Sequence, residues 1–199
     1  MHVLEQNPKA PFCHTNFEVI DGESHVFGKG YGGTLATYHE LLTGCGICAS
    51  TVVARRNACI RAGGFNLLVN TSEDFDLWLK MACDARAKSP FLGLTEPLAS
   101  YRVHIGGTSR RYAALHRASR QILEQHLSLA GFEGDEETTR AARQGLANIR
   151  FNYSGQAWAQ FLSTRKEGST AEARAHFLYA LRHAPGLTIR QIRSKVLRA

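Results

Sequence analysis

The stretch SEDFDLWLKMACDA, residues 72–85, decides how the rest of this chain is interpreted. Ser72 is a favourable N-cap residue, and the two acids after it, Glu73 and Asp74, suit the positive end of a helix dipole. Helical spacing places the side chains of Phe75, Leu79 and Ala82 on one apolar face. Trp78 widens this face. The pattern predicts a helix over residues 73–85 that packs one face against a core.

Extended segments surround this helix in the sequence. Residues 12–21 (FCHTNFEVID) predict a strand closed by a turn at Asp21-Gly22, and residues 47–54 (ICASTVVA) predict a buried strand. Residues 28–33 (GKGYGG) predict a flexible loop, because a phosphate-binding loop needs a GK-[ST] order and a following helix. The other predicted elements are a helix over 35–42, a helix over 55–62 stopped by Gly63-Gly64, and extended runs over 91–94 and 98–104. Residues 1–109 are therefore predicted to form an α/β unit.

From residue 110 onward the pattern becomes helical. A first helix is predicted up to a break marked by Gly131-Phe132 and the acidic cluster at 134–137, and a long helix follows to about Ser163. A further helix runs through STAEARAHFLYALRHAPG and stops at Pro185. This pairing resembles one helical hairpin of a tetratricopeptide-like array, although such arrays need about three repeats to be identified. Residues 110–199 are predicted as an all-α region.

Composition places the chain among ordinary globular proteins. Of its 199 residues, 44% are hydrophobic and 21% are charged, which excludes wholesale disorder, collagen and coiled coil. No run of consecutive apolar residues approaches the length of a membrane-spanning helix, and the N-terminus lacks the apolar region of a signal peptide. These features predict a cytoplasmic protein, which could bind peripherally to the inner face of the membrane.

Positive charge is concentrated in the second half of the chain. Residues 101–199 contain 16 Lys and Arg against 7 Asp and Glu, whereas residues 1–100 contain 8 against 10. The basic, amphipathic segment 187–199 could lie on an anionic membrane surface, or it could dock its apolar stripe on the preceding helices, which we favour. Binding to nucleic acid is not expected, because charge alone supports it and no base-reading motif accompanies the charge.

The five cysteines, all within the first 83 residues, predict free thiols in a reducing compartment. Cys45 and Cys48 form a CxxC pair, but no second ligand pair follows to complete a zinc site. Packing as small apolar side chains is the favoured interpretation.

Four short motifs occur in order between residues 47 and 109. They are a strand followed by Arg55-Arg56, the turn Gly63-Gly64-Phe65, the acidic helix start Ser72-Glu73-Asp74 with Asp76-Leu77-Trp78, and Tyr101-Arg102-Val103-His104. Each is weak alone, but together they resemble the second half of the catalytic domain of family 2 glycosyltransferases, which have the GT-A fold. The resemblance covers residues 3–109. It implies an inverting enzyme that transfers a sugar from a nucleotide-sugar donor to a hydroxyl of a glycan or lipid-linked acceptor.

The resemblance also implies roles for individual residues. Asp74, the second acid of the pair, would be the general base that takes the proton of the acceptor hydroxyl. Glu73 would cap the helix or hold the acceptor. The sugar would be approached by the backbone of Gly63 and Gly64 and by the side chain of Phe65, and Trp78 would either stack on the sugar or pack in the core, which we favour.

The remaining implied roles concern the leaving diphosphate. Arg102 and His104 would face it, unless they only decorate the end of a strand. The complete enzyme would use a divalent cation, Mg²⁺ or Mn²⁺, to neutralise the leaving group, with His104 as a candidate metal ligand.

One element of the family pattern is missing. The nucleotide-binding half, which ends in an Asp-x-Asp metal motif, should precede residue 1, and Asp74-Phe75-Asp76 cannot replace it because residues two apart on a helix diverge. The expected fold is therefore a partial GT-A-like mixed sheet followed by helices, belonging to a fragment, a truncated form or one part of a split enzyme. Such a chain should show little turnover alone, and it should tend to self-associate through exposed apolar surface.

A second hypothesis belongs to a different class. The chain could be a non-catalytic helical interaction module or a peripheral membrane-binding protein, whose basic helices carry the function. Salt-dependent binding that is insensitive to Asp74→Asn would favour this alternative.

Overall fold

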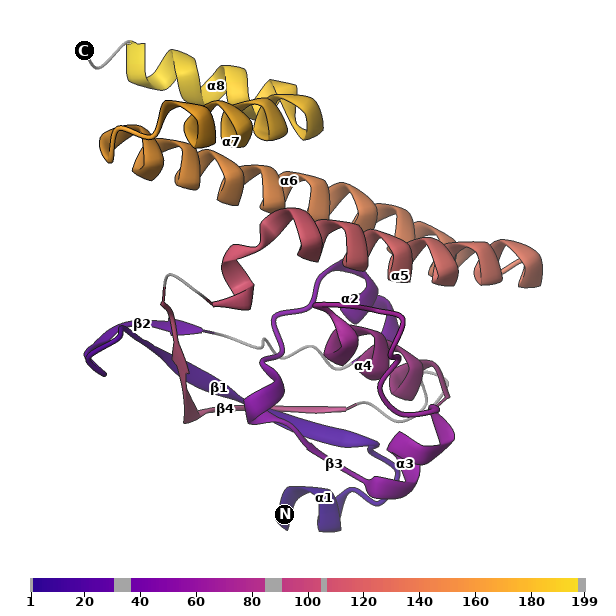
Figure 1. Cartoon of the computed structure of the whole chain (residues 1–199). Coiled ribbons are helices and arrows are strands. Elements are labelled where there is room, and N and C mark those ends of the chain that lie inside the picture. The colour runs from indigo at the N-terminus through magenta and orange to yellow at the C-terminus, as the bar shows by residue number, and fades with distance from the viewer. Residues whose placement is uncertain (1, 31–36, 85–90, 105–106, 197–199) are drawn as a thin grey trace.

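A small mixed sheet and its covering helices make up the structure (Figure 1), a computed structural model that describes residues 2–30, 37–84, 91–104 and 107–196. The strands are β1 (Phe12–Ile20), β2 (Val26–Gly30), β3 (Val53–Ala54) and β4 (Leu92–Arg102). The helices are α1 (His2–Gln6), α2 (Tyr38–Thr43), α3 (Arg56–Arg61), α4 (Glu73–Asp84), α5 (Tyr112–Glu133), α6 (Glu136–Lys166), α7 (Thr170–His183) and α8 (Pro185–Val196), with 3₁₀ turns at Ala49–Thr51 and Thr108–Arg110. The predicted α/β class and the helical tail are confirmed at this level.

Strand β1 is the centre of the sheet. It pairs in parallel with β4 along one edge, from Cys13 opposite Leu92 to Ile20 opposite Arg102. Its other edge pairs antiparallel with β2 near one end and with β3 near the other. The Asp-Gly turn predicted after β1 is present, because the Asp21 carboxylate accepts hydrogen bonds from the backbone N–H groups of residues 23 and 25.

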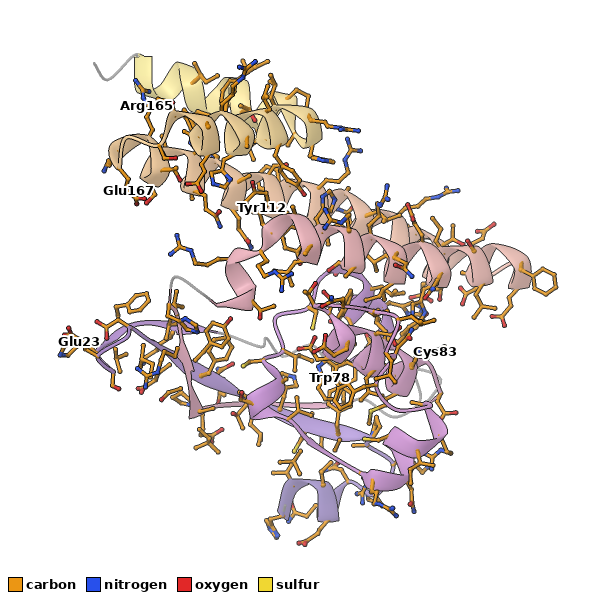
Figure 2. All side chains as sticks on the ribbon, viewed as in Figure 1. Glu23, Trp78, Cys83, Tyr112, Arg165 and Glu167 are labelled. Carbon is orange, nitrogen blue, oxygen red and sulfur yellow. The ribbon has the colours of Figure 1, made fainter. Side chains whose placement is uncertain are left out.

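The core lies between the sheet and α4. Phe12 of β1 stacks on Phe91 with ring centroids 4.6 Å apart, and Trp78 of α4 lies 5.3 Å from Phe12. Figure 2 shows Trp78 in the interior between the sheet and the helices that cover it. The apolar face predicted for the acidic helix is confirmed, since all four of its members are buried: Phe75, Trp78, Leu79 and Ala82. The helix begins at Glu73, directly after Ser72, as expected.

The buried strand predicted over residues 47–54 is wrong in extent. Only Val53 and Ala54 pair, and the residues before them form a 3₁₀ turn in which Thr51 donates from its backbone N–H and its hydroxyl to the carbonyl of Cys48. Pairing with β1 is limited to Phe12 opposite Ala54 and Cys13 opposite Val53, since the residues before Val53 follow the 3₁₀ turn and do not continue along β1. Val53 is consequently 41% exposed rather than buried.

The flexible loop predicted over residues 28–33 is partly wrong, because residues 28–30 belong to strand β2. Gly30 lies opposite Phe17, and a Cβ added at Gly30 would lie 2.0 Å from the Phe17 ring. Glycine is therefore needed here so that an aromatic ring can cross the neighbouring strand. Residues 31–33 of this prediction and residues 35–36 of the predicted short helix lie outside the described residues, and α2 begins at Tyr38.

The two extended runs predicted over 91–94 and 98–104 form one continuous strand, β4. The register shifts on either side of Asn16, which faces Pro97, and the Asn16 side chain donates to the carbonyl of Thr95 at 2.9 Å. Pro97 has no N–H for the ladder, so an irregularity of pairing allows the strand to continue past it.

The helical tail follows its predicted order with small shifts of the ends. The first break falls at Gly134, which has a φ of 71° and caps α5, and not at Gly131-Phe132, which stay helical. Asp135 then caps α6 through a 2.9 Å hydrogen bond from the N–H of Thr138. Pro185, predicted to stop α7, also begins α8, a position that suits its missing N–H.

Helices α5 and α6 pack directly on the α/β part of the chain. Ile122, Leu123 and Ala142 are fully buried in the same hydrophobic cluster as Phe12 and Trp78. Figure 1 shows α5 and α6 lying across α2 and α4, with α7 and α8 on the far side of α6. The residues on both sides of position 110 thus share one core, and this contact creates the pocket described next.

Candidate functional site

A pocket of about 580 Å³ lies where the N-terminus of α4 meets the end of α2 and the helices α5 and α6. The α/β part contributes acidic, hydroxyl and aromatic side chains to its lining: Phe65, Thr71, Glu73, Asp74 and Tyr101. Helix α6 contributes amide and hydroxyl side chains: Asn148, Asn152, Tyr153 and Gln156. A carboxylate, amides and aromatic rings therefore converge on one space.

Asp74 is half-buried in the first turn of α4. Its Oδ1 accepts a hydrogen bond from the N–H of Phe75 at 2.8 Å, which orients the carboxyl group. Burial in the pocket raises its pKa above the usual value of an aspartate, while the Phe75 hydrogen bond opposes this change and the nearby charge of Glu73 adds to it. The result is a positioned carboxylate that is more basic than an exposed one.

Asp76, the other acid of the Asp74-Phe75-Asp76 triplet, points elsewhere. It is 1% exposed, and its Oδ2 lies 2.6 Å from Nζ of Lys80 one turn later on the same helix. The expected divergence of the two aspartates is confirmed, and the triplet cannot chelate one metal ion.

Phe65 lines the pocket, and the two glycines before it form the end of α3. Gly63 and Gly64 have φ values of 81° and 67° and end α3, with the Gly64 N–H donating to the carbonyl of Cys59 at 2.9 Å. Nothing lies within 4 Å of a Cβ added at either glycine, so no neighbouring group of the described residues requires glycine here, and the approach of a sugar to this backbone stays a prediction. They give the chain the left-handed conformation that brings Phe65 to the pocket.

Three other predicted residues lie apart from the pocket lining. The Trp78 ring is 5% exposed and packs in the core, as the favoured alternative had it. Arg102 donates to the carbonyls of Asp21 and Gly22 and to the Ser24 hydroxyl, so it holds the turn between β1 and β2. His104 is exposed just after β4.

A divalent cation does not fit the residues described. Among residues 2–30, 37–84, 91–104 and 107–196, no three His, Cys, Asp or Glu side chains gather closely enough to hold a metal ion. His104 would be a lone ligand, and Asp76 is already paired with Lys80. We therefore derive no chemical step through a metal for this chain.

Thr71 was not found from the sequence, and it is conformationally strained. Its φ of 86° lies in the left-handed region, which is rarely adopted by a β-branched residue. Its hydroxyl is buried at the pocket without a hydrogen-bond partner among the described residues. Strain and an unpaired polar group next to Ser72 and Asp74 are typical of a site that awaits a ligand.

Thr71→Gly is expected to be more stable than Thr71→Ala by about 1 kcal/mol, because glycine removes the strain that alanine retains. Both variants lose the same hydroxyl, so their difference isolates the backbone contribution. Chemical denaturation of the two variants measures it. Equal stability, or greater stability of the alanine variant, would show that position 71 is unstrained.

The α6 residues were also missed, although the sequence contains a signal. Asn148, Asn152 and Gln156 recur every four residues and so form a polar stripe on one helix face. Asn148 is engaged, since its side chain donates to the carbonyl of Thr43 at 2.8 Å. Asn152 and Gln156 are exposed at the pocket and available to a ligand.

The tail contains no described helix with the length and apolarity needed to cross a bilayer. Within α8, Ile192 packs against the cluster formed by α6 and α7, whereas Ile189 is 46% exposed. One member of the apolar stripe therefore docks on the preceding helices, as the favoured alternative for this segment predicts.

Comparison with known proteins identifies no relative: no protein-family model matches the chain, and no curated protein matches it.

Proposed function

We propose that this chain provides the acceptor side of an inverting glycosyltransferase, with Asp74 as the general base. The observation that carries the proposal is the pocket that the half-buried Asp74 lines together with amide side chains of α6 and the rings of Phe65 and Tyr101. Sugars present both hydroxyl groups and apolar C–H faces, so amides and a carboxylate suit the former and aromatic rings the latter.

The chemistry is a single displacement. The acceptor oxygen forms a bond to the anomeric carbon of the donor, the bond from that carbon to the diphosphate oxygen breaks, and its electron pair leaves with the nucleoside diphosphate. The acceptor proton passes to the carboxylate of Asp74. Burial raises the pKa of this carboxyl group, which makes its carboxylate a stronger base than that of an exposed aspartate.

Asn152 and Gln156 would position the acceptor, and Thr71 would donate or accept a further hydrogen bond. The nucleotide sugar is the expected donor and a glycan or lipid-linked sugar the expected acceptor. The motifs between residues 47 and 109 support the resemblance to family 2 glycosyltransferases. The pocket is a separate observation, which supports the binding of a sugar.

Gln156→Ala is expected to weaken saccharide binding about fivefold, because one hydrogen bond is worth about 1 kcal/mol. The probe is a panel of methyl glycosides, and the measurement is saturation-transfer NMR on the full chain. Gln125→Ala is the matched control, since Gln125 is exposed on α5 outside the pocket lining. Absence of binding by every glycoside, or equal effects of the two variants, would contradict the proposal.

A further inference from the structure

A second cavity, about 910 Å³ in volume, lies among α5, α6 and α7. Its lining includes four arginines that come from all three helices: Arg117, Arg120, Arg150 and Arg182. One carboxylate, Glu124, accompanies them. The cavity therefore has a strong positive charge, and it accounts for part of the basic character of the second half of the chain.

These charges are largely uncompensated. The Glu124 carboxylate lies 3.8 Å from Arg120, and both side chains are more than half exposed, so the pair contributes little. No carboxylate of the described residues lies within ion-pair distance of Arg117, Arg150 or Arg182. Like charges held together on three packed helices repel one another, and a bound anion would relieve that repulsion.

A buried histidine gives the independent observation that points to a ligand. His116 lines the same cavity and is 5% exposed. Its Nδ1 lies 2.5 Å from the hydroxyl of Tyr179, while its Nε2 is buried without a hydrogen-bond partner among the described side chains. A buried polar atom without a partner is costly, and a ligand in the cavity would satisfy it.

Two neighbouring rings pack on the ring of His116. The His183 ring packs edge-on at 4.9 Å, and the Tyr153 ring lies at 5.6 Å on the α6 side. At the start of α5, Tyr112 (labelled in Figure 2) bonds to Nδ1 of His176 at 2.6 Å and so ties α5 to α7 beside the cavity.

The electrostatic field agrees with the geometry. Burial, together with the neighbouring His183, Arg120 and Arg150, lowers the pKa of His116 to about 4. Burial and three arginines lower the pKa of His183 in the same direction. When the Tyr179 hydroxyl donates to Nδ1, the neutral His116 ring carries its proton on Nε2, where it can donate to an anion.

We propose that this cavity binds a phosphate group, with the arginines contacting its oxygens and Nε2 of His116 donating from the base of the site. Guanidinium groups are suited to this task because they present paired N–H donors to two phosphate oxygens. The volume leaves room for a diphosphate or for the organic part of a phosphate ester. The site stands on α5, α6 and α7 and does not depend on the proposed transferase chemistry.

The test is isothermal titration of the full chain with inorganic pyrophosphate, with sulfate at equal ionic strength as the reference anion. Saturable binding of one pyrophosphate per chain is expected. The double variant Arg150→Gln, Arg182→Gln should weaken that binding by at least about tenfold, since it removes two guanidinium groups that donate charged hydrogen bonds. Both arginines are exposed surface residues, so the variant is expected to fold.

The matched control is Arg140→Gln, Arg174→Gln, which removes the same charge from the same two helices outside this cavity. The control should bind pyrophosphate within a factor of about two of the wild type, as expected for distant exposed charges. Equal weakening by both double variants would show that only the overall charge matters, and it would overturn the proposal. Absence of saturable pyrophosphate binding would overturn it as well.

A second arm distinguishes a lipid phosphate from a soluble one. Binding to phosphatidylcholine vesicles is compared with and without phosphatidic acid, for the wild type and both double variants. Loss of phosphatidic acid binding only in the cavity variant, with competition by pyrophosphate, would identify a lipid headgroup as the source of the phosphate. Equal vesicle binding by both double variants, with selective loss of pyrophosphate binding in the cavity variant, would identify a soluble phosphate.

Discussion

Asp74→Asn is expected to lower the rate of sugar transfer by about 10²–10⁴-fold, which is the usual contribution of a general base. Asparagine preserves the shape and the hydrogen bond from Phe75 but cannot accept the acceptor proton. The rate is measured with a panel of nucleotide sugars, with the chain joined to a donor-binding half of the kind that the proposed function implies. The same variant should leave binding of the methyl glycosides within a few-fold of the wild type.

Asp84→Asn is the matched control for this experiment. Asp84 is the last residue of the same helix and forms an exposed ion pair with Arg61 at 3.0 Å, away from the pocket lining. Its loss should leave the transfer rate nearly unchanged. A transfer rate that is equal in Asp74→Asn and the wild type would remove Asp74 from the chemistry.

Asp74→Asn should also change how stability depends on pH. The folded chain holds the Asp74 proton more tightly than the unfolded chain does, because the folded-state pKa is raised above the ordinary 3.8. As pH rises, the unfolded state loses its proton first, so the wild type loses stability until the folded-state pKa is passed. The difference in Tm between the variant and the wild type should therefore grow, in favour of the variant, from acid to neutral pH. A difference that shrinks as pH rises would mean that folding stabilises the carboxylate.

Gly145→Ala is the second substitution with a large expected effect. A Cβ at this position of α6 would lie 2.0 Å from the carbonyl oxygen of Leu42 and 3.2 Å from Cδ1 of Leu123. The backbone of α2 cannot move aside without disturbing the core, so we expect destabilisation of about 1–3 kcal/mol or more. Chemical denaturation gives the free energy of unfolding directly.

Gly155→Ala on the same helix is the matched control. Nothing lies within 4 Å of a Cβ at Gly155, so the substitution should stabilise the chain by about 0.5–1 kcal/mol through helix propensity alone. Opposite signs for the two substitutions are expected. A neutral or stabilising Gly145→Ala would show that α6 does not approach α2 closely, and the pocket would then lose one of its walls.

Local patterns predicted the elements that depend on nearby residues. The strand over Phe12–Ile20 with the turn after it, and the helix after Ser72 with its one apolar face, follow from patterns that neighbouring residues determine. The strands Val53–Ala54 and Val26–Gly30 were misjudged, because their extents depend on which residues reach β1 and on the space taken by Phe17. Those are tertiary effects, which local propensity cannot supply.

The residues of the candidate site also divide into those that local motifs predict and those that depend on tertiary packing. Asp74 and Phe65 were identified from motifs within one segment, and the structure places both on the lining of one pocket. Asn152 and Gln156 were missed because they reach the pocket only through the packing of α6 on α2, which Gly145 permits. Thr71 was missed because a positive φ at a threonine has no signature in the sequence.

The most direct measurement is ¹³C NMR of the Asp74 side-chain carboxyl group, titrated with pH in the absence and presence of methyl glycosides. We expect a pKa above that of an ordinary aspartate and a further change of the resonance when a glycoside fills the pocket. A carboxyl group that titrates at or below the ordinary value, with a resonance that no saccharide alters, would contradict the assignment of this pocket as an acceptor site.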